Sequence, residues 1–279
     1  MQVRWCQCLV ATFLIAAVWS IGFCGTAPMA EGTTISGQVE HSEKLPAVPT
    51  GLKSGAVFAQ AVVAPNPDTD WFSIPGWLAG TWQTIQISRI SKADDLTGET
   101  NATIATVASR ERETFGYQLD KVHGIWTPRH TFLPIVSSVS VQTLENEKSA
   151  QVPGTCYVTR DNYLISADES KVVLRSVDIS VVVRDDKNQI DSVEQRETVR
   201  TISPMSGGII AIASDTQVFD AKGYRKSHER TVEFRMQSRP FQVIDEFAGV
   251  SAHVSFAKYL QRTGRIGLTP TGEENSDAH

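Results

Sequence analysis

The sequence is poor in cysteine, which limits the ways in which a folded domain can be stabilised. It has 4 cysteines in 279 residues, and Cys6, Cys8 and Cys24 all fall within the first 30. Only Cys156 lies beyond them, so the rest of the chain forms no internal disulfide, and this lone cysteine is interpreted as a small buried hydrophobe. The domain must therefore be held together by its hydrophobic core, which 41% hydrophobic residues allow.

An excess of positive charge is also missing. The chain has 26 Lys and Arg against 31 Asp and Glu, and Arg4 is the one basic residue in the first 30, so the remainder carries a charge of about −6. This balance excludes the basic surface of a nucleic-acid-binding domain. Gly-x-Ser-x-Gly, His-Glu-x-x-His and phosphate-binding glycine loops are absent as well, so the sequence predicts no catalytic residue, cofactor or metal site. A dispersed Ser-His-Asp triad would leave no such motif.

Acidic residues are absent from Met1–Ala30, which reads as a targeting segment. Arg4 precedes an apolar run from Cys8 to Phe23, and small residues follow from Gly25 to Ala30. This order predicts a secretory signal peptide over 1–30, and the run is too short and too early for a membrane-spanning helix. We therefore predict export to the periplasm, the thylakoid lumen or the extracellular space. The bulky Phe23 argues against lipid attachment at Cys24.

The segment that follows lacks a sustained apolar period. Residues 31–70 include Pro46, Pro49, Pro65 and Pro67, a composition that predicts a flexible tether with one short ordered piece at Val57–Val63. We expect the folded domain to span 71–264 and the polar tail, 265–279, to be disordered.

Strand-like runs separated by turn signals fill the chain from Gly80 to Arg239. Arg160–Asn162, Asp185–Asn188 and Asp220–Gly223 are examples of the predicted turns. About ten consecutive strands with short connections predict an all-β fold, an antiparallel up-and-down barrel, because closure removes exposed sheet edges. A serine start and a glycine stop predict one short helix over Ser251–Gly264. The strand runs are expected near 81–90, 101–109, 112–119, 131–143, 153–159, 162–167, 171–184, 190–202, 208–219 and 223–238.

The first strand opens with Gly80-Thr81-Trp82, which resembles the Gly-x-Trp signature of the calycin group, the lipocalins and fatty-acid-binding proteins. The resemblance implies a calycin-like barrel in which Gly80 and Trp82 form the floor. Trp71 and Trp77 would then seal the segment that crosses beneath it. The longer string Pro75–Gln83 also resembles the start of an uncharacterised family from cyanobacteria and chloroplast lumens.

Alternation along the late strands predicts which side chains point into the barrel. In 171–184 the odd positions are mostly valine and isoleucine and include Arg175, so this face is expected to point inward. A hairpin centred on Lys187 pairs Val177 with Glu197 and places Gln195 on the same inward face. Arg196 and Arg200 belong to the opposite face, which is interpreted as solvated.

The register of 208–219 leaves two alternatives. A glycine-bulge turn at Asp220–Gly223 places Ser214 opposite Arg230 and Thr216 opposite His228. The rival register places Asp215 opposite His228. Both gather one polar layer on the predicted inner face: Arg175, Gln195, Glu197, His228 and Arg230.

This layer has two interpretations. It is a ligand site with cations for an anionic or hydrogen-bonding head group, or it is an ion-pair network that satisfies itself. The first favours an exported, non-enzymatic, lipocalin-like protein that binds a small hydrophobic or amphipathic molecule. The second favours a structural or interaction module of the cell envelope with a filled barrel. A third hypothesis is an enzyme on a calycin scaffold that uses His228 with Glu197. The sequence specifies neither the ligand nor the oligomeric state.

Overall fold

The computed structural model describes residues 41–59, 68–95, 97–101, 105–107, 111–135, 154–184, 188–247 and 249–270, which belong to one compact unit, Val39–His279. The predicted signal peptide and the last nine residues of the predicted tail, 271–279, lie outside them. None of the helices in these residues is long and apolar enough to cross a membrane.

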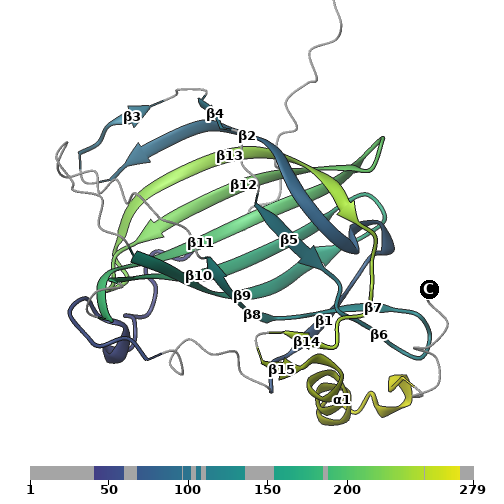
Figure 1. The fold of residues 1–279 in the computed structure, drawn as a ribbon. Coiled ribbons are helices and arrows are strands. Elements are labelled where there is room, and N and C mark those ends of the chain that lie inside the picture. Colours follow the sequence, from purple (N-terminus) through teal and green to yellow (C-terminus); the bar gives the residue numbers. More distant parts are fainter. Residues whose placement is uncertain are drawn as a thin grey trace, which may run out of the picture. The chain divides into compact units, whose positions relative to one another are not determined.

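One large antiparallel sheet dominates the fold and curls into a half-barrel (Figure 1). Successive antiparallel pairings run from β8 to β13, β2 pairs with the far side of β13, and β4 (Ala105–Val107) and β5 (Arg112–Phe115) pair with β2. The antiparallel, all-β prediction is therefore confirmed. Among the strands described, no pairing joins β5 to β8, so the sheet is open there rather than closed. In spatial order its main strands are β3 (Thr100–Asn101), β2 (Gly80–Asp94), β13 (Arg225–Arg239), β12 (Ile209–Phe219), β11 (Gln189–Met205), β10 (Val172–Arg184), β9 (Gly154–Ala167) and β8 (His130–Ile135).

The predicted turn at Arg160–Asn162 is wrong, because β9 is continuous. Arg160 pairs with Asp178 and Asn162 with Ser176, in unbroken register apart from one bulge opposite Val173 and Leu174. These polar residues resemble a turn in the sequence, but they belong to a polar cluster on one face of the sheet.

A smaller layer adjoins the half-barrel. It consists of the sheet β1 (Trp71–Ile74), β7 (Ile125–Pro128) and β6 (Gln118–Leu119), the hairpin β14 (Glu246–Phe247) and β15 (Val250–Ser251), helix α1 (Ala252–Arg262) and 3-10 helix η4 (Ile266–Leu268). The predicted helix is confirmed, and the Ser251 hydroxyl caps it by accepting from the Val254 backbone. Trp71 packs against Phe256 and donates to Ser255 Oγ at 3.3 Å, so it seals the helix rather than a barrel floor.

Trp82 anchors the main core at one end of the half-barrel. Its indole donates to the Leu78 carbonyl at 2.8 Å, from the 3-10 helix η3 (Gly76–Leu78). Gly80 has a φ of +132°, and a Cβ there would lie 2.7 Å from the Arg239 carbonyl. Glycine is therefore required where β2 and the end of β13 approach closely. The core consists of Ile74, Leu78, Ala79, Trp82, Phe115, Val172, Leu174, Ile202, Ile210 and Ile212.

The prediction of a flexible tether is wrong for His41–Phe58, which we name the strap (dark purple in Figure 1). Gly55 N donates to the Ile190 carbonyl at 2.8 Å, and Leu45 N donates to Gly223 at 3.1 Å. Its apolar residues are irregularly spaced and meet a ready-made sheet surface, so they show no period of their own. The buried cluster contains Val48, Leu52, Phe58, Val181, Val183 and Ile190, with 3-10 helix η1 (Thr50–Leu52) at its centre.

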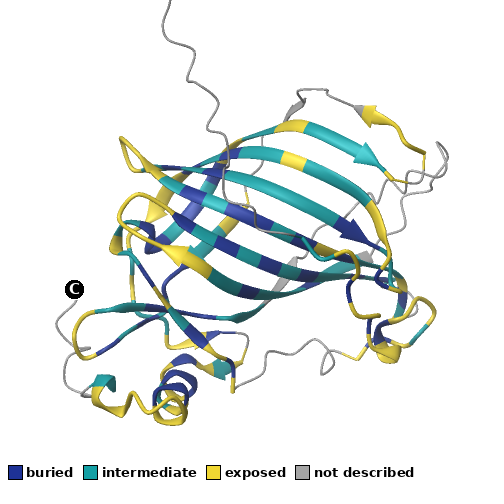
Figure 2. Cartoon of the chain, turned by 180° about the vertical axis from the view of Figure 1, so that it is seen from behind, coloured by how far each residue is buried: buried dark blue, intermediate teal, exposed yellow. Residues whose placement is uncertain are grey.

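The strap covers the outer face of the sheet. The face that the sequence predicts to point inward is this outer face, so that prediction is wrong. Buried and half-buried residues alternate along the central strands (Figure 2). On β10 the odd residue Val181 contacts the strap, whereas Leu174 belongs to the core around Trp82. The odd face is apolar because the strap covers it, and the even face lines the concave side.

Candidate functional site

Three arginines from alternate strands converge on one carboxylate on the concave side. Glu113 of β5 bonds Arg160 of β9, Arg200 of β11 and Arg235 of β13. In a flat sheet β9 and β13 would be separated by four strand spacings, roughly 19 Å. The guanidinium groups meet at one carboxylate because the sheet curls around it. Glu113 therefore marks the inside of the half-barrel.

Both carboxylate oxygens of Glu113 accept two hydrogen bonds from arginine. Its Oε1 accepts from Arg160 Nη1 at 3.1 Å and Arg200 Nη1 at 2.9 Å, and its Oε2 accepts from Arg200 Nη1 at 2.8 Å and Arg235 Nη1 at 2.6 Å. Burial acts to raise the pKa of Glu113, but the charges of the three arginines outweigh it and hold that pKa well below its usual range. Glu113 is ionised at any ordinary pH and does not serve as a proton donor.

Two more carboxylates complete this Glu113 cluster. Asp178 accepts from Arg160 Nε at 3.0 Å and from its Nη2 at 2.8 Å. Glu233 accepts from Arg235 Nε at 2.7 Å and also bonds Thr84. Three guanidinium groups thus face three carboxylates, so the cluster is close to electrically neutral.

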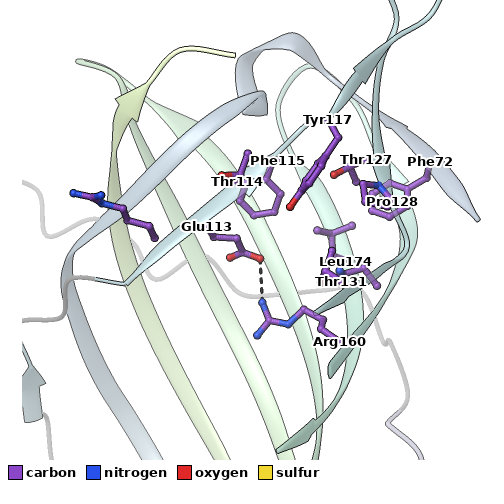
Figure 3. Close-up of a pocket in the computed structure, with 12 residues that line it drawn as sticks. Phe72, Glu113, Thr114, Phe115, Tyr117, Thr127, Pro128, Thr131, Arg160 and Leu174 are labelled. Atoms are coloured by element: carbon purple, nitrogen blue, oxygen red, sulfur yellow. Dashed lines mark hydrogen bonds and ion pairs between the residues drawn. The ribbon is translucent and has the colours of Figure 1, made fainter. Parts of the chain in front are cut away.

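A pocket of about 100 Å³ lies beside the Glu113 cluster (Figure 3). Its wall is apolar on the side of Phe72, Phe115, Pro128 and Leu174, and polar on the side of Glu113 and Arg160. Residues of β5, β8 and β9 contribute, so the pocket lies where the sheet is open. The remaining lining residues are Arg112, Thr114, Tyr117, Thr127, Thr131 and Asn162.

The polar side of the pocket offers mainly hydrogen-bond donors. Arg160 has five N–H groups, and its bonds to Asp178 and Glu113 leave one N–H on each of Nη1 and Nη2 without a partner among the described residues. The hydroxyl of Tyr117 points into the pocket and has no hydrogen bond to the described part of the chain (Figure 3). Burial, with the charge of Glu113, raises the pKa of Tyr117 to about 12, so this hydroxyl keeps its proton.

The residues predicted as a site lie on the outer face, where Gln195 and Glu197 are buried beneath the strap and Arg230 is largely exposed. The predicted pairing of Val177 with Glu197 is confirmed, and Arg175 Nε donates to Glu197 Oε1 at 2.7 Å. Gln195 is buried, but its side chain bonds the carbonyls of Pro46 and Asp220, each at 3.1 Å, and so fastens the strap and a turn.

Both predicted registers of β12 are wrong, the glycine-bulge register by one residue and its rival by two. The turn has the preferred geometry, because Asp220 N donates to the Tyr224 carbonyl at 2.9 Å. A bulge between Val218 and Phe219 then shifts the pairing, so that Asp215 faces Arg230 and Gln217 faces His228. The sequence gives no sign of this second irregularity.

The shifted register forms a cluster that includes residues outside the prediction. Asp215 accepts from His228 Nε2 at 2.6 Å and Arg230 Nε at 3.0 Å. His41 of the strap bridges to Asp215 and Glu197. We name this set the outer cluster: His41, Ser42, Arg175, Glu197, Asp215, His228 and Arg230. His228 bonds Asp215, and Gln217 lies between it and Glu197 in the register, so the hypothesis of an enzymatic His228–Glu197 pair gains no direct contact.

The sequence does not predict the site on the concave side. The sequence pattern places Arg200 on a solvated face, but Arg200 is 6% exposed on the concave side. Arg160 belongs to a predicted turn, and Glu113 lies in a short edge strand without any motif. The available signal is a set of charged residues on one face of the strands, at even positions in β9, β10 and β11 and at odd positions in β13 and β5. It can be interpreted only when the inward face is known.

No group of three or more His, Cys, Asp or Glu side chains in the described segments is arranged to hold a metal ion. Comparison of the chain with protein families, with curated proteins and with solved structures found no match.

Proposed function

We propose that the chain is an exported, lipocalin-like binding protein without catalytic activity, and that it takes a small molecule with a hydrogen-bond-accepting head group into the pocket beside Glu113. The observation that carries the proposal is the composition of the pocket wall. Phe72, Phe115 and Leu174 offer apolar surface, while Arg160 and Tyr117 offer donors.

The head group is a carbonyl or a carboxylate rather than a donor. The oxygens of Glu113 are occupied by arginines, so the cluster has no strong acceptor to spare. Arg160 and Tyr117 are half-buried, and an accepting ligand supplies a hydrogen-bond partner for their unused N–H and O–H groups. Because the cluster is charge-balanced, neutral amides and carbonyls suit the pocket as well as anions do.

The size of the pocket restricts the ligand further. An apolar cavity of about 150 Å³ holds benzene, so a pocket of about 100 Å³ encloses a group of a few carbon atoms. Long acyl chains do not fit inside it. A larger amphipathic ligand would insert only its head and the first carbons and leave the rest outside.

Titration with three small probes of matched shape tests the proposal. Isobutyrate and isobutyramide carry an accepting oxygen, and isobutane-1-thiol offers almost none. We expect the first two to shift the NMR signals of residues around Tyr117 and Leu174, and the thiol to bind much more weakly. Tyr117→Phe should weaken the binding of isobutyramide roughly two- to tenfold, which corresponds to the loss of one hydrogen bond.

A blocking variant separates pocket binding from surface binding. Thr131→Phe places a ring at the pocket wall, and Thr159→Phe places the same ring on the outer face of the neighbouring strand. Binding should be lost in the first variant and retained in the second. If none of the probes binds the wild-type protein, or if both variants bind equally well, the proposed function is wrong.

A second candidate function is favoured by the Glu113 cluster itself. Because the cluster satisfies its charges internally, the half-barrel also suits a structural or interaction module of the cell envelope. The two candidates differ in the probe titration, since a structural module gives no saturable binding at the pocket. The likeness of Gly80-Thr81-Trp82 to the calycin signature supports the first.

A further inference from the structure

We propose that the strap is a reversible cover, and that its His41 end unlatches from Glu197 and Asp215 when the His41 ring loses its charge, while the sheet beneath remains folded. The two ends of the strap are held by different contacts, at His41 and at Phe58, and neither residue lines the pocket.

Both ring nitrogens of His41 face carboxylates. Nδ1 lies 3.3 Å from Glu197 Oε2, and Nε2 lies 2.9 Å from Asp215 Oδ1. A neutral imidazole has one N–H and one lone pair, so it can donate to only one of these groups. The other contact would then set a lone pair against a carboxylate. The closed latch therefore requires the imidazolium.

Neighbouring groups fix the electrostatics of the latch. The hydrogen bonds to Asp215 and then Glu197 raise the pKa of His41 to about 9, although burial acts to lower it. The next strap residue, Ser42, adds its backbone N–H to Glu197 Oε2 at 2.7 Å and its hydroxyl to Oε1 at 3.0 Å. The other charged groups around His41 are Arg175 from β10, His228 and Arg230 from β13, and Glu43 and Lys44 on the strap.

The opened state leaves no buried charge without a partner. Glu197 keeps its ion pair with Arg175, and Asp215 keeps its ion pair with Arg230 and its hydrogen bond with His228. Opening also admits water to Gln217, whose buried Oε1 has no partner within the described residues. The latch can therefore release without unfolding the strands that carry it.

The other end of the strap is held differently. Phe58 stacks on Tyr157 at 4.4 Å between ring centroids, and its backbone N–H donates to Asn188 at 2.9 Å. These apolar and backbone contacts do not depend on the charge of His41. Loss of that charge should free the His41 end first and leave the Phe58 end in place.

Hydrogen exchange of the full-length chain at several pH values tests this proposal. Protection factors corrected for intrinsic exchange should fall for the amides of Ser42 and Leu45, which are hydrogen-bonded at the His41 end, by about tenfold or more between pH 7 and 10. This follows from a His41 pKa that moves from about 9 closed to 6.5 open. Protection of β10 and β11 should remain. Simultaneous loss in strap and sheet would mean global unfolding and would refute a local latch.

Three variants assign the effect to His41. His41→Gln should remove the protection of the His41 end of the strap already at pH 7, and His41→Arg, which keeps a charge, should retain more of that protection at pH 10. His228→Gln is the matched control, because His228 also contacts Asp215 but is not part of the strap. The proposal fails if His41→Gln is as protected as wild type at pH 7, or if His228→Gln abolishes the pH dependence.

Discussion

The residue with the most concentrated electrostatic role is Glu113. One carboxylate bonds three arginine side chains, of which those of Arg200 and Arg235 are only 8% and 7% exposed. A buried ion pair contributes little net stability compared with an apolar replacement, but removing one partner leaves charge without compensation. Removing the charge of Glu113 should therefore destabilise the protein much more than removing that of a surface carboxylate.

We expect Glu113→Gln to lower the free energy of unfolding by about 3 to 5 kcal/mol. Urea denaturation measures the change. Glu194→Gln is the control, because Glu194 pairs with Arg196 in an exposed position and such pairs contribute about 1 kcal/mol or less. Equal effects of the two variants would contradict the structural assignment.

At the scale of elements, the strap depends on a glycine in the β12–β13 turn. Gly223 has a φ of +85°, and a Cβ on it would overlap the carbonyl oxygen and carbon of Leu45. The absence of a side chain lets the strap cross the turn closely enough for its backbone to pair with it.

Gly223→Ala should thus displace the strap. Gly207→Ala is the matched control, because its φ is +75° but nothing lies within 4 Å of its Cβ position. The free energy of unfolding of the control should fall by about 1 to 2 kcal/mol, because alanine is unfavourable at a positive φ. Gly223→Ala should lower the free energy of unfolding by more than this, and its strap amides should exchange faster. Equal losses and unchanged exchange in both variants would show that the contact with Leu45 is unimportant.

Elements governed by local rules were predicted well, and those governed by distant contacts were not. The β10–β11 hairpin and helix α1 follow from a turn, a cap and a period, all within a few residues. The bonds of Glu113 to Arg160 and Arg235 join residues 47 and 122 positions apart, and no local pattern encodes them. The inner face was misassigned because alternation shows that two faces differ but not which one a strap covers.

At the scale of the whole molecule, stability should depend on pH from both sides. The pKa of Glu197 is lowered from 4.5 to about 2 by hydrogen bonds from His41, Ser42 and Arg175, which outweigh burial. Its contribution is present above pH 4.5 and is lost as the pH falls toward 2. His41 acts in the opposite sense: its contribution is complete below pH 6.5 and is lost as the pH rises through 9.

Unfolding free energies measured in urea between pH 3 and 10 should therefore be highest between about pH 4.5 and 6.5. In His41→Gln the free energy of unfolding should fall less steeply at alkaline pH. Most of its fall at acid pH should remain, because Glu113 and Asp215, whose pKa values are also lowered, still titrate. An alkaline slope that is unchanged in this variant would assign the decline to another group.

The strap also constrains the order in which the chain folds. His41 meets Glu197 across 156 positions and Asp215 across 174, whereas the hairpins beneath form between neighbouring strands. Closing so long a loop is entropically unfavourable until its contacts exist to offset it. The first segment of this domain to be synthesised thus finds its place only after β10, β11 and β12 have assembled the surface that receives it.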